Sequence, residues 1–537
     1  SVSSPAAPAN TSPSFSDSLS RSPQTAALRS ASEQEFSVIE DLTMRYPDYA
    51  VFSEEIRKSE KAAREESGSS FALMHRAAET LRDALLCEIP SVSRVLIAAG
   101  GGNNGGDGLE LAAILTERGI GALCILPKDP SPGTEAAEAL AHLTAAGGKT
   151  VREFPSPEAL AGFDLLVDAV LGIGVRSPLR EDAADFIRKI NGAGLPVLSV
   201  DVPSGLNADS GAAPDGAVEA KWTVSLLGLH PGLFTGDGPL YAGKVIFDDL
   251  GTGTGKTPGD DPFSPLLLTY ERVRDLIPQR PRTAYKGLSG RVAVIGGAPM
   301  YPGAAALASR GALRSGAGLV RCVAHEKSLP LIFAGCPEIM LGEADSDGIS
   351  DALSFAGSVV LGPGLGRSEW SRGVYEQASG AEKPMVTDAD GLFFLASDPS
   401  TNPKRVITPH EGEAARLLSM AFAGVHNSRF EAAEELQRIY GGVAVLKGPG
   451  TIIRSKDAQA LCLEGNEGMA TGGMGDLLSG IIGAFLASGR LSLFMAACLG
   501  VTIHSRAGDI AAADGKTGML AEDLIPIVRR LASGIGG

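Results

Sequence analysis

The stretch from Arg94 to Leu126 constrains the fold of this 537-residue chain more than any other. A short apolar run over 94–99 leads directly into a glycine-rich loop at 100–108. A helical pattern follows over 109–118, and a second apolar run over 120–126. Strand, glycine loop, helix and strand make a β-α-β unit, and such units build parallel sheets. We therefore expect an α/β protein.

The same alternation of strand and helix continues along the whole chain, which is too long for one hydrophobic core. The predicted organisation is a disordered tail at 1–40, a Rossmann-like α/β/α domain at 50–250, a Gly- and Pro-rich linker at 251–265 and a second α/β domain at 270–537. Further strands are expected at 163–170, 196–201, 221–227, 244–247, 291–297, 319–324, 358–361, 384–387, 405–407 and 443–446. The last two helices are expected at about 476–488 and 492–513, mostly buried.

An acidic net charge limits the partners of this chain. Its formal charge is −16 at pH 7, without a basic stripe, so neither nucleic acid nor a membrane is expected as a partner. Glycine loops and helix N-termini bind phosphate without net positive charge, which leaves phosphorylated small molecules. The expected location is cytoplasmic, or an organelle if residues 1–35 are a targeting segment. We also expect a homo-oligomer.

Polar side chains in the first half fall at the carboxyl ends of predicted strands, where ligands of parallel sheets bind. Asn104 and Asp107 follow the first strand, and Asp168 and Asp201 end later ones. Asn104, Asp168 and Ser204 offer oxygen ligands for one hard cation. Taken singly, Asp107 is also compatible with a helix cap and each strand-end aspartate with a loop anchor.

Three loops of the first half, Gly101–Gly108, the Asp168 loop and Asp201–Gly205, together resemble the NAD(P)H-hydrate epimerase (YjeF N-terminal) domain. The resemblance implies interconversion of the R and S hydrates of NADH and NADPH at C6, with Asp201 contacting the substrate and moving the proton. It also implies a K⁺ ion held by Asn104, Asp168 and Ser204. The implied hydrate-binding residues are Asn103, Asn104, Gly105, Gly106, Asp107, Gly172, Ile173, Gly174, Val175, Arg176, Ser177, Pro178 and Asp201.

The segment Ala470–Asp476 is the main chemical motif of the second half. Its glycines let backbone N–H groups turn inward at a helix start, which makes an anion hole. Asp476, at that helix start, is placed to take a proton from an attacking hydroxyl. A capped helix after a glycine turn is the structural alternative. His410 and Lys447 are candidate contacts to substrate and nucleotide, against a structural histidine and a surface-turn lysine.

These motifs, with Tyr301–Ala305 and Leu361–Gly366, resemble the ADP/ATP-dependent NAD(P)H-hydrate dehydratase domain, which has a ribokinase-like fold. The resemblance implies phosphorylation of the C6 hydroxyl by ADP or ATP with Mg²⁺, then elimination of phosphate. Met474 departs from the family pattern, which has Thr there, so a hydroxyl contact to phosphate is lost. The implied contacts to the hydrate are Ala304, Gly364, His410 and Asp476. The implied contacts to the adenine nucleotide are Lys447, Gly448, Pro449, Gly450, Thr451 and Gly475.

The whole chain thus resembles the bifunctional NAD(P)H-hydrate repair enzymes, with NADH or NADPH hydrate and an adenine nucleotide as small-molecule partners. The first alternative is a ribokinase-type small-molecule kinase fused to a nucleotide-binding module. The second is a first domain that binds nucleotide without catalysis. Asn104, Asp168 and Asp201 occurring together argue against a silent domain.

Overall fold

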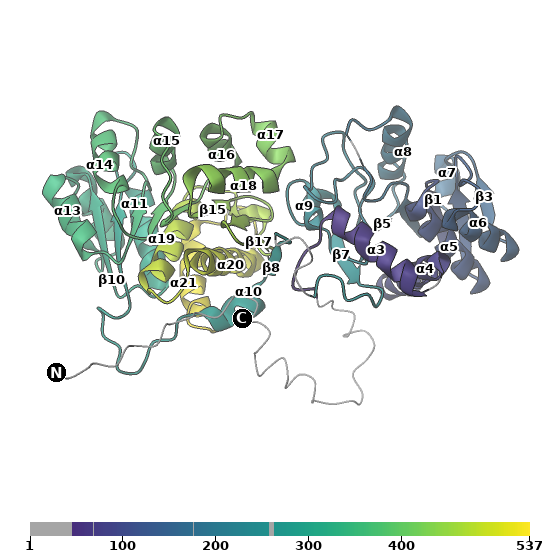
Figure 1. The fold of residues 1–537 in the computed structure, drawn as a ribbon, viewed down its shortest axis with the longest axis horizontal. Helices are drawn as coiled ribbons and strands as arrows, with labels where there is room; N and C mark the ends of the chain where they lie inside the picture. Colours follow the sequence, from purple (N-terminus) through teal and green to yellow (C-terminus); the bar gives the residue numbers. More distant parts are fainter. Residues whose placement is uncertain (1–45, 68, 176, 257–262, 537) are drawn as a thin grey trace, which may run out of the picture. The chain divides into compact units, whose positions relative to one another are not determined.

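The computed structural model describes residues 46–256 and 263–536, apart from residues 68 and 176. The tail predicted at 1–40, part of the predicted linker and Arg176 therefore lie outside the described residues. Two sheets with helices around them make up the described chain (Figure 1). The predicted class, two-domain α/β with parallel sheets, is confirmed.

The first sheet has seven strands in the order β3-β2-β1-β4-β5-β6-β7, and every neighbouring pair is parallel. The strands are β1 (Arg94–Ala99), β2 (Gly121–Ile125), β3 (Lys149–Val151), β4 (Leu165–Ala169), β5 (Val197–Val200), β6 (Trp222–Leu226) and β7 (Lys244–Asp248). The chain winds outward from β1 in one direction and resumes at β4 in the other. The loops after β1 and β4 therefore diverge at a topological switch point, which is where such sheets bind ligands.

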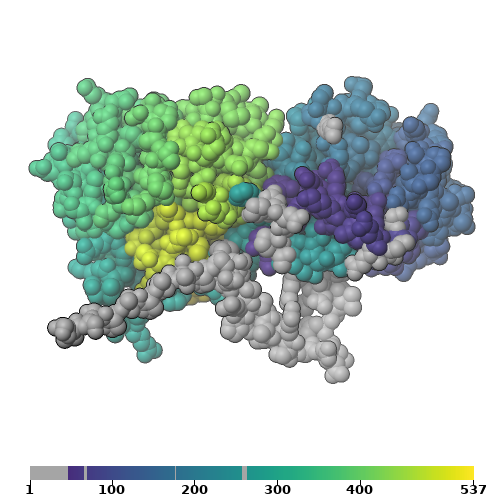
Figure 2. All heavy atoms as spheres, viewed as in Figure 1, coloured from purple at the N-terminus to yellow at the C-terminus, as the bar shows by residue number. Residues whose placement is uncertain are grey.

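Helices cover both faces of this sheet. α4 (Ser70–Glu88), α5 (Asn103–Glu117) and α6 (Glu135–Ala145) pack on one another, and α5 packs on β1, β2 and β4. Leu96 and Ala98 of β1 point to the other face, where they share a core with Leu160 of α7 (Pro157–Leu160) and Ile187 of α8 (Glu181–Asn191). The alternation along β1 is the two-residue period of a strand buried on both sides. α3 (Ser53–Ser67) lies on the surface drawn in Figure 2.

Close packing explains the glycines of the 100–108 segment. A Cβ on Gly105 would lie 1.8 Å from the backbone oxygen of Gly100, and one on Gly108 would lie 2.7 Å from the Cβ of Ala169. Helix α5 can approach the sheet this closely only without side chains at these positions. The helix therefore begins at Asn103, six residues before the predicted start at 109, and Gly105, Gly106 and Gly108 lie in its first two turns instead of in a loop.

The second sheet has ten strands in the order β11-β10-β9-β12-β13-β14-β15-β16-β17-β8. The strands are β8 (Leu266–Leu268), β9 (Arg291–Ile295), β10 (Leu319–Ala324), β11 (Met340–Glu343), β12 (Ser358–Leu361), β13 (Met385–Thr387), β14 (Arg405–Ile407), β15 (Val443–Leu446), β16 (Ile452–Arg454) and β17 (Gln459–Cys462). Among the strand pairs of the described residues in this sheet, β15–β16 and β16–β17 are antiparallel and the others are parallel. Its switch point lies between β9 and β12, so the loops that follow these two strands frame a second site.

Two helical layers enclose the second sheet. One contains α11 (Pro302–Arg314), α19 (Met474–Ala487), α20 (Leu493–Ala511) and α21 (Ala521–Leu531), which pack on one another. The other runs from α13 to α18 (green in Figure 1): α13 (Ser346–Phe355), α14 (Glu369–Ser379), α15 (Asp390–Ser397), α16 (Glu411–Leu417), α17 (Phe422–Asn427) and α18 (Arg429–Tyr440). The short helices outside these layers are α9 (Gly238–Tyr241), α10 (Tyr270–Val273) and α12 (Leu329–Gly335).

Buried helices near 476–488 and 492–513 are confirmed as α19 and α20, but the prediction that they are the last two helices was wrong. α21 follows, with Leu524, Ile525 and Val528 buried. Its Pro526 weakens the helical pattern in the sequence, and packing on α11 and α20 compensates. Within the described part of the chain, no helix combines the length and apolar character needed to cross a membrane.

Candidate active sites

A cavity of about 1480 Å³ opens at the switch point of the first sheet. It gathers residues from α3, the start of α5 and the loops after β1, β4 and β5. The predicted site residues that line it are Asn103, Asn104, Asp107, Gly172, Ile173, Gly174, Val175 and Asp201. Gly105 and Gly106 are buried under its wall, and Ser177 and Pro178 lie outside the lining. The structure thus brings most of the predicted hydrate-binding residues together.

Asp107 is not a helix cap, so that alternative was wrong. The cap of α5 is Gly102, and Asp107 lies in the second turn, facing the cavity. Burial raises its pKa well above the usual value for an aspartate, and the negative charge of Asp201 raises it further. Asp107 therefore holds its proton more tightly than an exposed aspartate does.

Asp168 is the most enclosed carboxyl group of this site, with no exposed surface. Its Oδ1 accepts a hydrogen bond from the Ser204 hydroxyl at 2.6 Å, and its Oδ2 accepts from the Ser199 hydroxyl and the Ser204 backbone N–H, both at 2.9 Å. Asn104 joins the group by donating from its Nδ2 to the backbone oxygen of Leu171 at 3.0 Å. Burial raises the pKa of Asp168. Among the described residues it forms no ion pair with a basic side chain.

Asp201 follows β5 in an unusual backbone conformation. Its φ is +66°, in the left-handed region that costs a non-glycine residue free energy. Its Oδ1 accepts hydrogen bonds from the backbone N–H of Leu226 at 3.2 Å and from Nε2 of His230 at 2.9 Å. His230 is completely buried. Sequence reasoning missed it, because a histidine in Gly-Leu-His-Pro-Gly carries no pattern that points to a distant aspartate.

The second site is built around the start of α19. Gly473 caps this helix with φ +93°, and Asp476 lies in the first turn. Free backbone N–H groups at a helix start attract anions. The helix dipole favours the ionised form of Asp476, but burial of the side chain has the larger effect and raises its pKa to about 7. The negative charge of Asp388 adds to this increase.

Lys447 holds a carboxylate network beside this loop. Its Nζ lies 3.0 Å from Oδ1 of Asp388 and 3.8 Å from Glu413, and the Ser479 hydroxyl donates to Oδ2 of Asp388 at 2.5 Å. A Cβ on Gly475 would lie 3.2 Å from the Lys447 Nζ, so the two predicted nucleotide contacts are neighbours. The surface-turn alternative for Lys447 was wrong, because its side chain is only 19% exposed.

Charge balance sets the protonation of this network. Burial opposes the charged form of both partners, but each stabilises the other: the pKa of Lys447 is raised, and that of Asp388 is lowered. Asp388 lies inside a predicted motif, yet no role was assigned to it. Glu413 and Ser479 were missed, because only the fold brings them to Lys447.

His410 caps α16 instead of pointing into a core. Its Nδ1 accepts hydrogen bonds from the backbone N–H groups of Gly412 and Glu413 at 3.0 and 3.3 Å. The side chain is 61% exposed, and its Nε2 lies 3.6 Å from the Glu413 carboxylate. Ala304 and Gly364 meet at the switch point, where a Cβ on Gly364 would lie 3.0 Å from the Ala304 Cβ.

Hydrogen bonds from Thr235 and Arg429 to backbone oxygens fix the loop at 447–451. The Thr235 hydroxyl donates to the backbone oxygens of Pro449 and Gly450 at 3.1 Å. The fully buried Arg429 donates to the Thr235 hydroxyl and to the backbone oxygen of Lys447. This support fixes a loop whose predicted task is to bind phosphate.

The first domain is a doubly wound sheet with an acid-lined cavity, and the second has an anion loop beside an aspartate. Together these features define a two-domain enzyme that acts on nucleotide-type substrates. The protein-family model described as YjeF-related protein N-terminus matches residues 70–232. The family model described as NAD(P)H-hydrate dehydratase matches residues 292–530. The chain belongs to the family of bifunctional NAD(P)H-hydrate repair enzymes.

Relatives along nearly the whole chain support this membership. The bifunctional NAD(P)H-hydrate repair enzyme of Coxiella burnetii is 40% identical over 487 residues, covering 89% of this chain and 98% of the relative. That of Escherichia coli is 39% identical over 496 residues, covering 91% and 94%. Among solved structures, a ribokinase-like superfamily protein of Enterococcus faecalis is 27% identical with a TM-score of 0.46, covering 50% of this chain and 94% of that protein. The expected identity, a bifunctional epimerase and dehydratase, is confirmed.

Proposed function

We propose that the two sites divide the repair of NADH and NADPH hydrates between them. The domain at about 50–250 interconverts the R and S hydrates, and the domain at about 270–537, after the linker at 251–265, dehydrates the S form with ATP or ADP. The observation that carries the proposal is Asp476, a carboxyl group with a pKa of about 7 at the mouth of an anion loop.

In the first site, the hydrate lies between the start of α5 and the loop after β4. Epimerisation at C6 needs the hydroxyl to leave, which makes an iminium-type cation, and water to return on the other face. A carboxylate stabilises such a cation and moves the proton. Asp201 takes this role, because it faces the cavity and is fixed by two hydrogen bonds to Oδ1.

K⁺ fits the group formed by Asn104, Asp168 and Ser204. The donors are hard oxygens, and Asp168 is a buried carboxylate without a cationic partner among the described residues. A bound K⁺ would supply the missing positive charge and order the Leu171 loop. Replacing K⁺ by tetramethylammonium should lower epimerase activity in the wild type and have little further effect in Asp168→Asn. Equal activity in both salts would refute the ion site.

In the second site, the loop at 447–451 and Gly475 bind the nucleotide phosphates, while Ala304, Gly364 and His410 contact the hydrate. Asp476 takes the proton from the C6 hydroxyl as its oxygen attacks the terminal phosphorus, and the C6 phosphate then leaves. Phosphorylation converts a poor leaving group into a good one. Mg²⁺ would neutralise charge on the nucleotide phosphates. The buried Asp388 carboxylate, paired with Lys447 at 3.0 Å, lies beside Gly475 of this site.

One assay separates the proposal from its alternatives. The full chain is incubated with a mixture of R and S hydrates and ATP or ADP, and the reduced-nicotinamide absorbance is followed. Full recovery of both epimers supports repair. A stable phosphorylated product from another alcohol would support the ribokinase-type kinase.

Asp476→Asn tests whether the first domain is catalytic. This variant should stop dehydration while R and S hydrates still interconvert, because the two sites are separate. Failure to consume R hydrate with an intact first domain would support the silent binding module. The proposed location is cytoplasmic, or an organelle if 1–35 is a targeting segment, and the proposed assembly is a homo-oligomer.

A further inference from the structure

His230 is a buried titratable group that the proposed chemistry does not yet use. Its Nε2 lies 2.9 Å from Oδ1 of Asp201, and its Nδ1 is buried without a hydrogen-bond partner among the described residues. A neutral imidazole carries one N–H, and the ring nitrogen that faces a carboxylate is the one that gains by donating. His230 therefore donates from Nε2 to Asp201.

This contact orients the Asp201 carboxylate. Oδ1 receives both hydrogen bonds, from His230 and from the backbone N–H of Leu226, while Oδ2 receives none from the described residues. Asp201 also lines the cavity. One oxygen is thus fixed to the protein, and the other is free to accept a proton from a molecule in the cavity.

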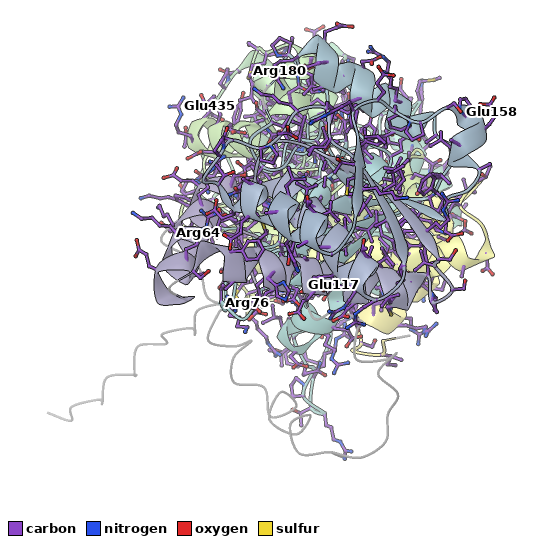
Figure 3. All side chains as sticks on the ribbon, turned by 90° about the vertical axis from the view of Figure 1, so that its right-hand side faces the viewer. Arg64, Arg76, Glu117, Glu158, Arg180 and Glu435 are labelled. Atoms are coloured by element: carbon purple, nitrogen blue, oxygen red, sulfur yellow. The ribbon has the colours of Figure 1, made fainter. Side chains whose placement is uncertain are left out.

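A second carboxyl group enters the same cavity from another wall. Asp107 projects from α5, whereas Asp201 comes from the end of β5. The charged groups that act on Asp107 are Glu60 and Arg64 of α3, Glu110 of α5 and Asp201. Arg64 is already paired with Glu60 at 2.5 Å, and Figure 3 marks its place on α3. Burial and the surrounding acids outweigh Arg64, so Asp107 holds its proton more tightly than an exposed aspartate does.

We propose that epimerisation uses these two carboxyl groups as an acid and base pair, Asp107 as proton donor and Asp201 as proton acceptor, with His230 as a positioning residue for Asp201. The inference rests on the proposed epimerase function of the first site. The two carboxyl groups reach the same cavity from different elements, which is the arrangement that an acid and base pair requires.

In the R to S direction, Asp107 gives its proton to the C6 hydroxyl, the C6–O bond breaks, water leaves, and the ring nitrogen lone pair forms the C=N bond. A water molecule then attacks C6 from the other face, a new C–O bond forms, and its proton passes to Asp201. Solvent in the open cavity returns the proton from Asp201 to Asp107. In the S to R direction the two groups exchange roles.

The test uses the full chain without nucleotide, so that dehydration is off, and purified R hydrate of NADPH. Conversion to the S form is measured by chromatography. Asp107→Asn and Asp201→Asn should each lower kcat by about a hundredfold or more, with a smaller change in KM. Glu153→Gln is the matched control, since it removes an exposed carboxylate from the lining of the same cavity without removing a proton carrier. It should stay within about threefold of wild type.

The positioning role of His230 is tested by comparing kcat in a variant that loses the N–H donor with kcat in one that keeps it. His230→Leu removes the N–H donor and should lower kcat about tenfold, while His230→Gln keeps an N–H donor and should recover most of that loss. A thermal unfolding curve of each variant that matches wild type reports that its first domain is folded. In H₂¹⁸O, each inversion should incorporate one solvent oxygen at C6.

Three outcomes would overturn the proposal: near wild-type kcat in Asp107→Asn, equal loss in His230→Gln and His230→Leu, or inversion without ¹⁸O. If the wild-type chain does not interconvert the hydrates at all, the proposed epimerase function fails instead. The two failures are therefore distinguishable.

Discussion

The pKa of Asp476 gives a quantitative prediction about dehydration. Burial raises this pKa from 3.8 to about 7. Only the ionised carboxylate can take the proton of the C6 hydroxyl, so one pH unit below that value about a tenth of the free enzyme is active. We expect kcat/KM for the S hydrate to rise with pH through a midpoint near 7, and Asp476→Asn to lower it by about 10²–10⁴-fold.

The charge of Lys447 near Asp476 predicts the direction in which the pH midpoint moves when that lysine is replaced. Lys447 lowers the pKa of Asp476 by its positive charge. Lys447→Met should therefore move the midpoint to higher pH, in addition to weakening nucleotide binding. The assay is recovery of reduced-nicotinamide absorbance with saturating nucleotide. Epimerase activity in the same samples is the control, and Asp476→Asn should leave it unchanged. A flat profile through neutral pH, or an unmoved midpoint in Lys447→Met, would refute the role of Asp476 as the base.

The same pKa predicts a cost in stability. The pKa of Asp476 is higher in the folded than in the unfolded chain. The free energy of unfolding of the wild type, compared with that of Asp476→Asn, is therefore highest at low pH and falls as the pH rises from about 4 through about 7. The shift corresponds to about 4 kcal/mol at most. Urea unfolding above neutral pH should find Asp476→Asn more stable than wild type, and equal stability would contradict the burial of an ionised group.

Three further variants test other parts of the structure. Gly105→Ala should destabilise the first domain by about 3 kcal/mol or more in thermal or urea unfolding, because its Cβ would lie 1.8 Å from a backbone oxygen; Gly102→Ala, with open space around its Cβ, is the control and should cost less than about 1 kcal/mol. The side-chain hydrogen bond to the fully buried Glu110 raises the pKa of His142, so Glu110→Gln should lower that pKa in an NMR titration. The variant should also lose the stability that the wild type has at low pH and that disappears as the pH rises through the folded pKa of His142. An unchanged titration would contradict the contact. Met474→Thr restores a hydroxyl at the anion loop and should lower the nucleotide KM about fivefold at similar kcat, whereas an unchanged KM would show that the hydroxyl makes no phosphate contact here.

Sequence periodicity was sufficient for the class of fold and for the sheet edges at which the candidate sites lie. Strands β1, β9 and β10 lie where the apolar runs predicted them, because strands buried on both faces give continuous apolar segments. Elements with weak local signals were missed: β11 and β16 are three or four residues long and lie at or near an antiparallel or edge position, where pairing with neighbours stabilises them.

The sequence by itself determined which loops are candidates for the chemistry, since loops at the carboxyl ends of parallel strands must meet at one edge of a sheet. It placed Asp201 and Asp476 there as candidate proton carriers. Only the tertiary structure decided how they are tuned. His230 reaches Asp201 from 29 residues away, and Lys447 pairs with Asp388 from 59 residues away. Burial and through-space charge set the pKa of a carboxyl group, and neither is encoded in its sequence neighbours.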